Sequence, residues 1–237
     1  MNRLEFIRNE EKKYHDFCYN HFSLFEEGSW LAKPVKTVID LMSFFEIKNN
    51  VQVLDLGCGV GRNSIPVAEK LKNSYGKVVC VDFLDSAIEK LKFYSLQYGV
   101  EHIIHAEKAD IGTYFIEPHQ YDFIVAISSL EHVESESVFD KVLHRIASGT
   151  KPGGIACFII NSEVQEIDRI TNEYLDALME INLLTDSVLA KLDHVFQNWK
   201  VLMELVKPLE YEITRNHRSI LLTTNAITFV ARKGNEK

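Results

Sequence analysis

An apolar run that ends in a glycine-rich turn is the segment of this chain with the clearest chemical potential. Residues Val51 to Leu56 read as a buried strand, and Gly57, Gly59 and Gly61 follow it at every second position. Glycine lacks a Cβ and tolerates positive φ, so such a turn lets bare backbone approach a ligand. The next residues read as a helix, whose first N–H groups have no partner within the helix. Together these features predict a site for a small molecule or cofactor.

The spacing of the glycines discriminates between ligands. The dinucleotide fingerprint G-x-G-x-x-G needs a third glycine, and this chain has Arg62 or Ser64 at that position in the two possible registers. The phosphate-binding loop needs Gly-Lys-Ser/Thr, which does not follow. Asp55, just before the turn, suits a ligand with a cationic amino-acid part better than a pyrophosphate. A nicotinamide oxidoreductase is therefore disfavoured.

The stretch 55–61, Asp-Leu-Gly-Cys-Gly-Val-Gly, resembles motif I of the class I S-adenosylmethionine-dependent methyltransferases. The resemblance extends from the mid-forties to the C-terminus. Within that family, residues 61–64 (Gly-Arg-Asn-Ser) and 229–233 (Phe-Val-Ala-Arg-Lys) are similar to small-molecule methyltransferases of the tellurite-resistance type. The resemblance implies an α/β fold: a Rossmann-like seven-stranded sheet, parallel with a C-terminal antiparallel hairpin, with helices on both faces.

The resemblance also implies that S-adenosyl-L-methionine binds beyond the carboxyl ends of the strands. Asp82 matches the family's acidic residue that accepts both ribose hydroxyls, and hydrogen bonds to a charged acceptor contribute about 1.5–3 kcal/mol each. Phe83 is expected against the adenine face, and Asp110 is expected to accept from the adenine amino group. Ile111 would donate its N–H to the ring, and the end of the strand 121–127 would contact the methionine part. The expected cofactor-binding residues are Asp55, Gly57, Cys58, Gly59, Gly61, Asp82, Phe83, Asp110, Ile111, Ala126 and Ile127.

Structural roles stay open for several of these residues. Asp110 would also suit the cap of a short helix, and Phe83 would suit a core position. A solvent-facing acid that caps the next helix is the alternative for Asp82, although Asp85 fits that role better. Asp55 either orients the turn or receives the ligand's ammonium through water. Arg62 either reaches the ligand's carboxylate or pairs with a neighbouring acid.

Methyl transfer from a sulfonium is an in-line displacement, to which an enzyme contributes mainly alignment and exclusion of water. Residues 128–133 follow the expected strand 121–127 and face the acceptor in the family. His132 is the best candidate for a general base because imidazole ionises near neutral pH, and Glu131 lies beside it. The alternative is that both residues only set the start of the next helix. No Asn-Pro-Pro-Tyr-type tetrad follows this strand, which disfavours methylation of bases and glutamines.

Strand-like and helix-like segments alternate from Val51 onward, which by itself predicts a parallel sheet covered by helices. We expect Asn63 to cap a helix, residues 151–154 to form a turn, and the segment around 216–218 to be the tip of a hairpin. Pro208 is expected to bend or shorten its strand. Strands are expected over 51–56, 77–82, 103–109, 121–127, 155–160, 199–213 and 219–230.

The expected organisation is an N-terminal helical cap or lid over residues 1–45 and a methyltransferase domain over 46–237. A helical insertion near 163–194 would lie over the open edge of the site. An aromatic-rich stretch near the N-terminus would close over the acceptor as a lid, or would only pack the helices. Its members are Tyr14, His15, Phe17, Phe22 and Trp30.

The amino-acid composition limits the kinds of molecule that this protein is expected to bind. The formal charge of −8 opposes unsteered binding to nucleic acid or anionic membrane, so a small-molecule acceptor is favoured and nucleic acid is an unlikely partner. No apolar stretch is long enough to span a membrane, and the polar start predicts no signal peptide. The four cysteines form no C-x-x-C pair, and His102 and His105 would point to opposite faces of a strand, so no metal site is expected. The sequence predicts a cytoplasmic monomer or homodimer that transfers a methyl group to a small molecule. The alternative is a non-catalytic S-adenosylmethionine-binding or regulatory protein of the same fold.

Overall fold

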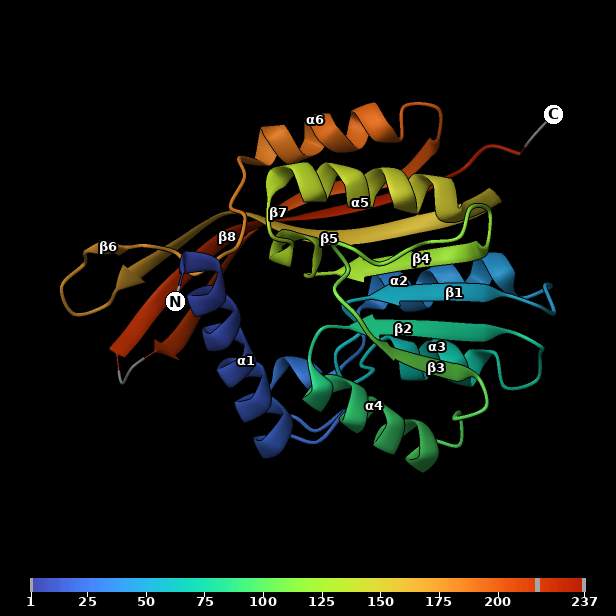
Figure 1. The fold of residues 1–237 in the computed structure, drawn as a ribbon, viewed down its shortest axis with the longest axis horizontal. Helices are drawn as coiled ribbons and strands as arrows, with labels where there is room; N and C mark the ends of the chain where they lie inside the picture. The colour runs from blue at the N-terminus through green and yellow to red at the C-terminus, as the bar shows by residue number, and fades with distance from the viewer. Residues whose placement is uncertain (1, 216–217, 236–237) are drawn as a thin grey trace.

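A single mixed β-sheet organises the molecule. The computed structural model describes residues 2–215 and 218–235. Seven strands follow the order β3-β2-β1-β4-β5-β8-β7, and the short β6 pairs only with β5 (Figure 1). The strands are β1 (Gln52–Leu56), β2 (Lys77–Asp82), β3 (Ile104–Lys108), β4 (Tyr121–Ile127), β5 (Thr150–Asp168), β6 (Tyr174–Leu175), β7 (Lys200–Arg215) and β8 (Arg218–Arg232).

The direction of the strands confirms the predicted α/β fold. The pairs β1–β2, β2–β3, β1–β4 and β4–β5 are parallel. The pairs β5–β8 and β7–β8 are antiparallel, as predicted for a closing hairpin. The strand β6 is an addition that the sequence did not predict.

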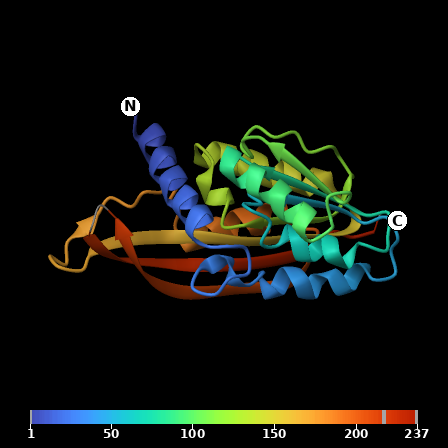
Figure 2. The ribbon, with the colours of Figure 1, turned by 90° about the horizontal axis from the view of Figure 1, so that it is seen from below.

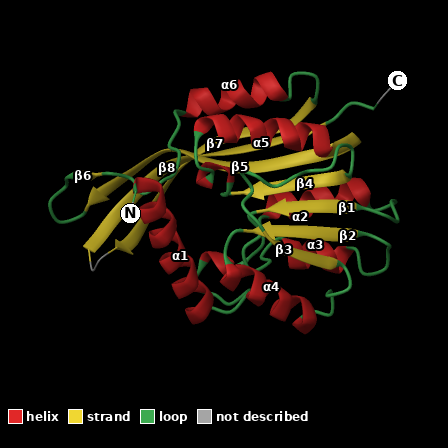
Figure 3. Ribbon diagram, in the orientation of Figure 1, coloured by secondary structure: helices red, strands yellow, loops and turns green. Residues whose placement is uncertain are grey.

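Helices cover both faces of the sheet (Figure 3). One buried apolar cluster joins the sheet to α1, α2, α3 and α4, and a second joins the other face to α5 and α6. The central strand β4 is buried along its whole length, which explains why it reads as a continuous apolar run. The helices are α1 (Arg3–His21), α2 (Lys36–Leu41), α3 (Ser64–Lys70), α4 (Asp85–Gln97), α5 (Glu136–Gly149) and α6 (Thr185–Val195), with short 3₁₀ helices η1 (Trp30–Ala32), η2 (Met42–Phe45) and η3 (Leu130–His132).

Three local predictions need correction. Residues 163–194 are helical only over α6, because β5 continues to Asp168 and the chain then forms β6. The predicted turn at 151–154 lies inside β5, where the register against β4 shifts and Gly153 takes a φ of +76°. Asn63 stands at the start of α3 but makes no side-chain cap. Its side-chain oxygen instead accepts a hydrogen bond from the backbone N–H of Val35.

Pro208 does not shorten its strand. It pairs with Asn225 within the continuous β7–β8 ladder. The reason is that β7 is the edge of the sheet, where a residue without an N–H is tolerated. The last described pair of this hairpin is Arg215 with Arg218, and residues 216–217 of the predicted tip fall outside the described part of the chain.

Long strands carry the sheet beyond its parallel part. The strands β5, β7 and β8 contain 19, 16 and 15 residues, and α1 projects beside their extension (Figure 2). The side chain of Arg3 hydrogen-bonds to Asp176 and to two backbone carbonyls of the same loop. Nearer its other end, α1 is held by a hydrogen bond from Ser86 to Asp16. The helix α1 therefore bridges the loop after β6 and the start of α4. Within the described residues, no helix is both long and apolar enough to cross a membrane.

Candidate active site

The three glycines after β1 have different structural roles. All three adopt positive φ, +75° at Gly57, +53° at Gly59 and +95° at Gly61. A Cβ at Gly57 or Gly61 would lie 2.3 or 2.5 Å from a neighbouring side chain, so both positions require glycine for packing. A Cβ at Gly59 would meet only the hydroxyl of Tyr19, at 3.2 Å. The backbone at Gly59 is therefore the part of the turn that is open to a ligand, beneath a side chain of α1.

Asp82 ends β2 directly beside this turn. Its Oδ2 accepts a hydrogen bond from the N–H of Gly59 at 2.8 Å, and its Oδ1 accepts one from the N–H of Leu84 at 2.9 Å. Burial raises the pKa of Asp82, although both backbone donors oppose the rise. Each carboxylate oxygen has a second lone pair, so the group can still accept from two hydroxyls. Asp85, the better candidate for a solvent-facing acid, is indeed exposed and pairs with Lys108.

Asp55 lies buried beneath the turn. The hydroxyl of Ser64 donates to its Oδ2 and so joins the end of β1 to the start of α3. Burial raises the pKa of Asp55 to about 6, with the Ser64 hydrogen bond opposing and the nearby Asp82 adding to the rise. This contact fits the first alternative, in which Asp55 orients the turn. Cys58 is also buried, and burial raises the pKa of its thiol well above the usual value.

The predicted adenine contacts lie together but are already engaged. Phe83 is 49% exposed, and the Cζ atom of Arg8 lies 5.1 Å from its ring centroid. The Oδ2 of Asp110 accepts from Arg8 at 3.1 Å, while Oδ1 accepts from the N–H of Gly112 at 2.7 Å. Asp110 thus also caps a turn at residues 111–113, where its alternative predicted a short helix. The side chain of Arg8 brings α1 to both residues.

The end of β4 lies between β1 and β5. Ala126 and Ile127 are buried there, and Ala126 pairs with the last residue of β1. Ser128 follows in a left-handed conformation with a φ of +49°, and its N–H donates to the carbonyl of Ile159. The hydroxyl of Ser129 donates to the carbonyl of Leu56 at 2.7 Å. These bonds fix the start of the segment that carries Glu131 and His132 against the neighbouring strand ends.

Glu131 ties this segment to β5. Its Oε1 accepts from the backbone N–H and the side-chain amide of Asn161, at 3.0 and 2.6 Å. Its Oε2 is buried without a hydrogen-bond partner among residues 2–215 and 218–235. Burial raises the pKa of this carboxyl against the opposing charge of His132. The two bonds to Asn161 favour a positioning role for Glu131.

The surroundings of His132 favour the protonated, cationic form of its imidazole. Its Nδ1 lies 2.9 Å from Oε2 of Glu180. Burial alone would lower the pKa of His132, but the Glu180 hydrogen bond and the charges of Glu131 and Glu11 outweigh it and raise the pKa to about 9. A protonated imidazole has no free lone pair with which to accept a proton. The predicted general-base role therefore requires that His132 first separate from Glu180.

Sequence reasoning named His15 of α1 but missed Arg8, Glu11 and Tyr19 of the same helix. Arg8 reaches Phe83 and Asp110, and Tyr19 reaches the turn. Glu11 lies 3.5 Å from the Nε2 of His15, and the hydrogen bond to His15 and the charge of His132 hold the pKa of Glu11 below its usual value despite burial. Residues 8, 11, 15 and 19 follow helical spacing and share one face of α1. This helical spacing was the signal in the sequence that could have identified these residues as one face of α1.

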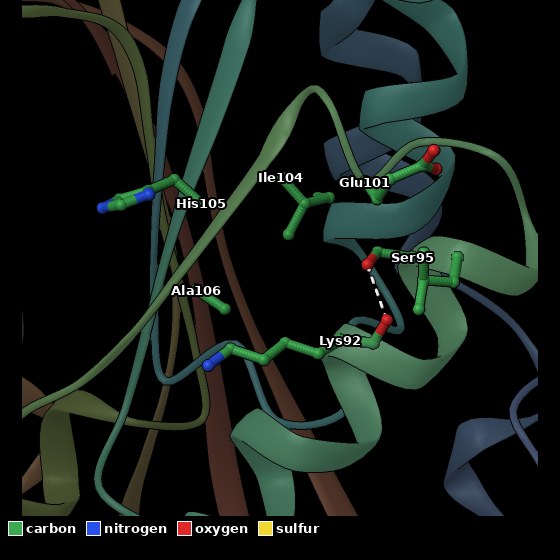
Figure 4. Close-up of a pocket in the computed structure, with 7 residues that line it drawn as sticks. Lys92, Ser95, Glu101, Ile104, His105 and Ala106 are labelled. Carbon is green, nitrogen blue, oxygen red and sulfur yellow. Dashed lines mark hydrogen bonds between the residues drawn. The ribbon is translucent and has the colours of Figure 1, made fainter.

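A depression elsewhere on the surface does not belong to this site. It lies between α4 and the edge strand β3, and its labelled lining residues are shown in Figure 4. His105 there pairs with Glu107 at 3.1 Å. None of the predicted site residues contributes to it.

Comparison with known proteins finds relatives in sequence and in fold. The sequence model of the family described as "Methyltransferase domain" matches residues 53–154. The sterol 24-C-methyltransferase of Candida albicans is 27% identical over 136 residues, which are 57% of this chain and 35% of that protein. A tRNA N(3)-methylcytidine methyltransferase of Schizosaccharomyces pombe is 24% identical over 152 residues, 62% of this chain and 48% of that protein. TehB from Haemophilus influenzae has a similar crystal structure, with a TM-score of 0.60 at 20% identity over 84% of this chain and 62% of TehB.

The chain shares its fold with solved S-adenosylmethionine-dependent methyltransferases, and residues 53–154 match the sequence family of methyltransferase domains. This class uses S-adenosyl-L-methionine as its methyl donor. The chain spans only about a third to a half of the curated relatives that it matches.

Proposed function

We propose that this protein transfers the methyl group of S-adenosyl-L-methionine to a small-molecule acceptor. The observation that carries the proposal is the contact between Gly59 and Asp82. It places an open stretch of backbone next to a partly buried carboxylate with unused lone pairs at the ends of two neighbouring strands. These groups fit the amino-acid part and the ribose of the methyl donor.

Each predicted side chain has a defined task in this proposal. Asp82 accepts from the ribose hydroxyls. Phe83 and Asp110 receive the adenine, and the backbone at Ala126 and Ile127 contacts the methionine part. Bound S-adenosylmethionine supplies a methyl group that its sulfonium already activates, so the protein's own contribution is alignment and exclusion of water.

The negative net charge of the protein favours a small-molecule acceptor over a nucleic acid. The net charge of −8 repels polyanions at long range. The sterol methyltransferase among the relatives acts, by its name, on a small molecule, whereas the tRNA enzyme does not. The acidic side chains of Glu11 and Glu180 near His132 would add local repulsion against a phosphate backbone.

The segment 1–45 is proposed as the lid of the site. Its helix α1 already contacts Phe83, Asp110 and the glycine turn through side chains on one face. We further propose a cytoplasmic monomer or homodimer. The four cysteines are free thiols and all are buried, which fits a reducing compartment.

Calorimetric titration with S-adenosylmethionine and, separately, with NAD tests the cofactor. We expect micromolar binding of S-adenosylmethionine and none of NAD. Transfer of a labelled methyl group to a panel of small molecules then separates an enzyme from a non-catalytic binding protein. Binding of NAD alone, or of neither compound, would refute the proposed function.

A further inference from the structure

Three buried side-chain atoms have no hydrogen-bond partner among the described residues. Nε of Arg62 lies beside the glycine turn, whereas Oε2 of Glu131 belongs to η3 and Nδ1 of His15 belongs to α1. Glu131 is only 1% exposed, and its other oxygen already accepts two hydrogen bonds from Asn161. A buried polar atom without a partner is costly, so Glu131 and His15 mark a place where a ligand would stabilise the protein.

Both of these unpartnered atoms are hydrogen-bond acceptors. An ionised carboxylate oxygen accepts and cannot donate. Nε2 of His15 lies 3.5 Å from Oε2 of Glu11, and in the neutral imidazole that has its proton on Nε2, Nδ1 is an acceptor. The contact of 3.5 Å is longer than a strong hydrogen bond, so Glu11 also has accepting capacity left. The ligand group that fits this set is one that donates hydrogen bonds.

The charges around these atoms are mainly negative. Burial alone would lower the pKa of His132, but the hydrogen bond of Glu180 and the charges of Glu131 and Glu11 raise it to about 9. Three carboxylates therefore lie within electrostatic reach of one imidazolium. Arg215 also acts on Glu11, but its guanidinium is already paired with a carboxylate of β5. An additional positive charge would be stabilised here.

An organic cation suits this place better than a metal ion. Within residues 2–215 and 218–235, no group of three or more His, Cys, Asp or Glu side chains is arranged to hold a metal. An ammonium group has three N–H donors and no acceptor, which matches a set of unpartnered acceptors.

Aromatic rings of the N-terminal segment lie beside the same groups. The ring of His15 is 5.4 Å from that of Tyr14, 5.6 Å from that of Tyr19 and 5.8 Å from that of Trp30. Trp30 already holds one cation, because Cζ of Arg62 lies 5.2 Å from its ring centroid and Nη1 donates to its carbonyl at 2.9 Å. Aromatic faces attract organic cations and pack against apolar groups. These surroundings suit an ammonium that is attached to an apolar body.

The acidic and aromatic groups adjoin the expected donor site. Burial raises the pKa of Asp82, and the charge of His15 is among the effects that oppose the rise. The hydroxyl of Tyr19 is 3.2 Å from the position of a Cβ at Gly59. Glu131 lies in the segment that follows β4. A molecule bound by these groups would therefore lie next to the methyl donor.

We propose that the methyl acceptor is an amine with an apolar body, bound as its ammonium by Glu131 and Glu11, with Nδ1 of His15 as a third acceptor. This inference rests on the proposed function. An anionic acceptor would bring further lone pairs to groups that already lack donors, and an alcohol would supply a single donor.

The bound ammonium must lose one proton before its nitrogen has a lone pair. Glu131 takes this proton at Oε2, since burial raises the pKa of its carboxyl against the opposing charge of His132. The nitrogen lone pair then forms the bond to the methyl carbon, and the electron pair of the broken carbon–sulfur bond stays on sulfur. The products are a methylated ammonium and a neutral thioether.

Probes of matched skeleton and different charge test the acceptor class. Phenethylamine, phenethyl alcohol and phenylacetate form one set, and hexylamine, hexanol and hexanoate form a second. Each is titrated by calorimetry into the protein saturated with S-adenosylhomocysteine, the demethylated product, so that no turnover occurs. In at least one set, the amine should bind about 10-fold or more tightly than the alcohol, and the carboxylate should bind most weakly.

Two variants then locate the ammonium. Glu131→Gln and Glu11→Gln keep the size of the side chain but remove its charge, and each should weaken amine binding by about 10-fold or more. Both should leave the affinity for S-adenosylhomocysteine within about threefold. Glu10→Gln is the matched control. Glu10 precedes Glu11 on α1 and pairs with Lys13 at 2.6 Å, so its replacement should change neither affinity.

The proposal is overturned if neither amine binds more tightly than its alcohol, which includes the case in which none of the six probes binds. It is also overturned if Glu131→Gln and Glu11→Gln leave amine binding unchanged, or if they weaken amine and S-adenosylhomocysteine equally. If thermal unfolding shows that Glu131→Gln is not folded, Glu11→Gln decides. Failure of the wild type to bind S-adenosylhomocysteine and S-adenosylmethionine would instead refute the proposed function itself.

Discussion

Arg8 occupies both side chains that we expect to hold the adenine. Its guanidinium lies over the ring of Phe83 and pairs with Oδ2 of Asp110. The adenine can stack on that face and donate to that oxygen only if Arg8 leaves them. Cofactor binding must therefore break both contacts, and we expect Arg8→Ala to bind S-adenosylmethionine more tightly than the wild type.

The size of the effect follows from the two contacts. The ion pair joins side chains that are 25% and 27% exposed, and such a pair contributes about 0.2–1 kcal/mol. A guanidinium over an aromatic ring contributes about 0.5–1 kcal/mol at a site of this exposure. Their sum of about 0.7–2 kcal/mol corresponds to about 3- to 30-fold in affinity.

Titration calorimetry on Arg8→Ala and wild type measures this difference. Arg3→Ala is the control, because Arg3 lies on the same helix and forms an ion pair with Asp176 at 3.2 Å without touching Phe83 or Asp110. We expect Arg3→Ala to stay within about twofold of the wild type. Weaker binding by Arg8→Ala would mean that Arg8 remains against the bound adenine. Unchanged binding would mean that the adenine does not use these two residues.

Three further outcomes are expected. Asp82→Ala should weaken S-adenosylmethionine binding by roughly 10- to 100-fold through loss of two charge-assisted hydrogen bonds, and an unchanged titration would contradict the ribose assignment. Gly59→Val should abolish binding, because a β-branched residue is strained at the φ of +53° and its side chain would enter the open space at the turn. Circular dichroism should show that the protein still folds, and retained binding would place the ligand elsewhere. The pKa of His132 is raised to about 9 in the folded protein, against about 6.5 in the unfolded chain. The pairing of His132 with Glu180 therefore stabilises the fold fully below pH 6.5, and this stabilisation is lost as the pH rises through 9. Urea unfolding should therefore show about 1–3 kcal/mol more loss between pH 7 and 10 in wild type than in His132→Gln, and identical pH profiles would argue against the pairing.

The central strands could be predicted from the sequence almost to the residue. The ranges 77–82 and 121–127 were expected and observed, and 51–56 was one residue too long. These strands are buried on both faces, so their apolar runs and the polar or glycine residues that end them mark the boundaries locally. The residues expected at the carboxyl ends of these strands also lie there, because parallel strands must bring those ends together.

The extension of β5 could not be predicted in the same way. Residues 165–168 pair with β8 more than fifty positions further along the chain, after a shift of register between Ser162 and Gln165, and this pairing overrides a mixed pattern that reads as helical. The bulge at 151–154 likewise depends on its register against β4.

The sequence by itself determined the class of fold, the glycine turn and the acidic residue beside it, because these depend on the order and spacing of residues near one another in the chain. Only the tertiary structure decided what surrounds them. Arg8 meets Asp110 across 102 positions, and Glu180 meets His132 across 48. Charge and burial act through space, so the raised pKa of His132 follows from neighbours that no local pattern specifies.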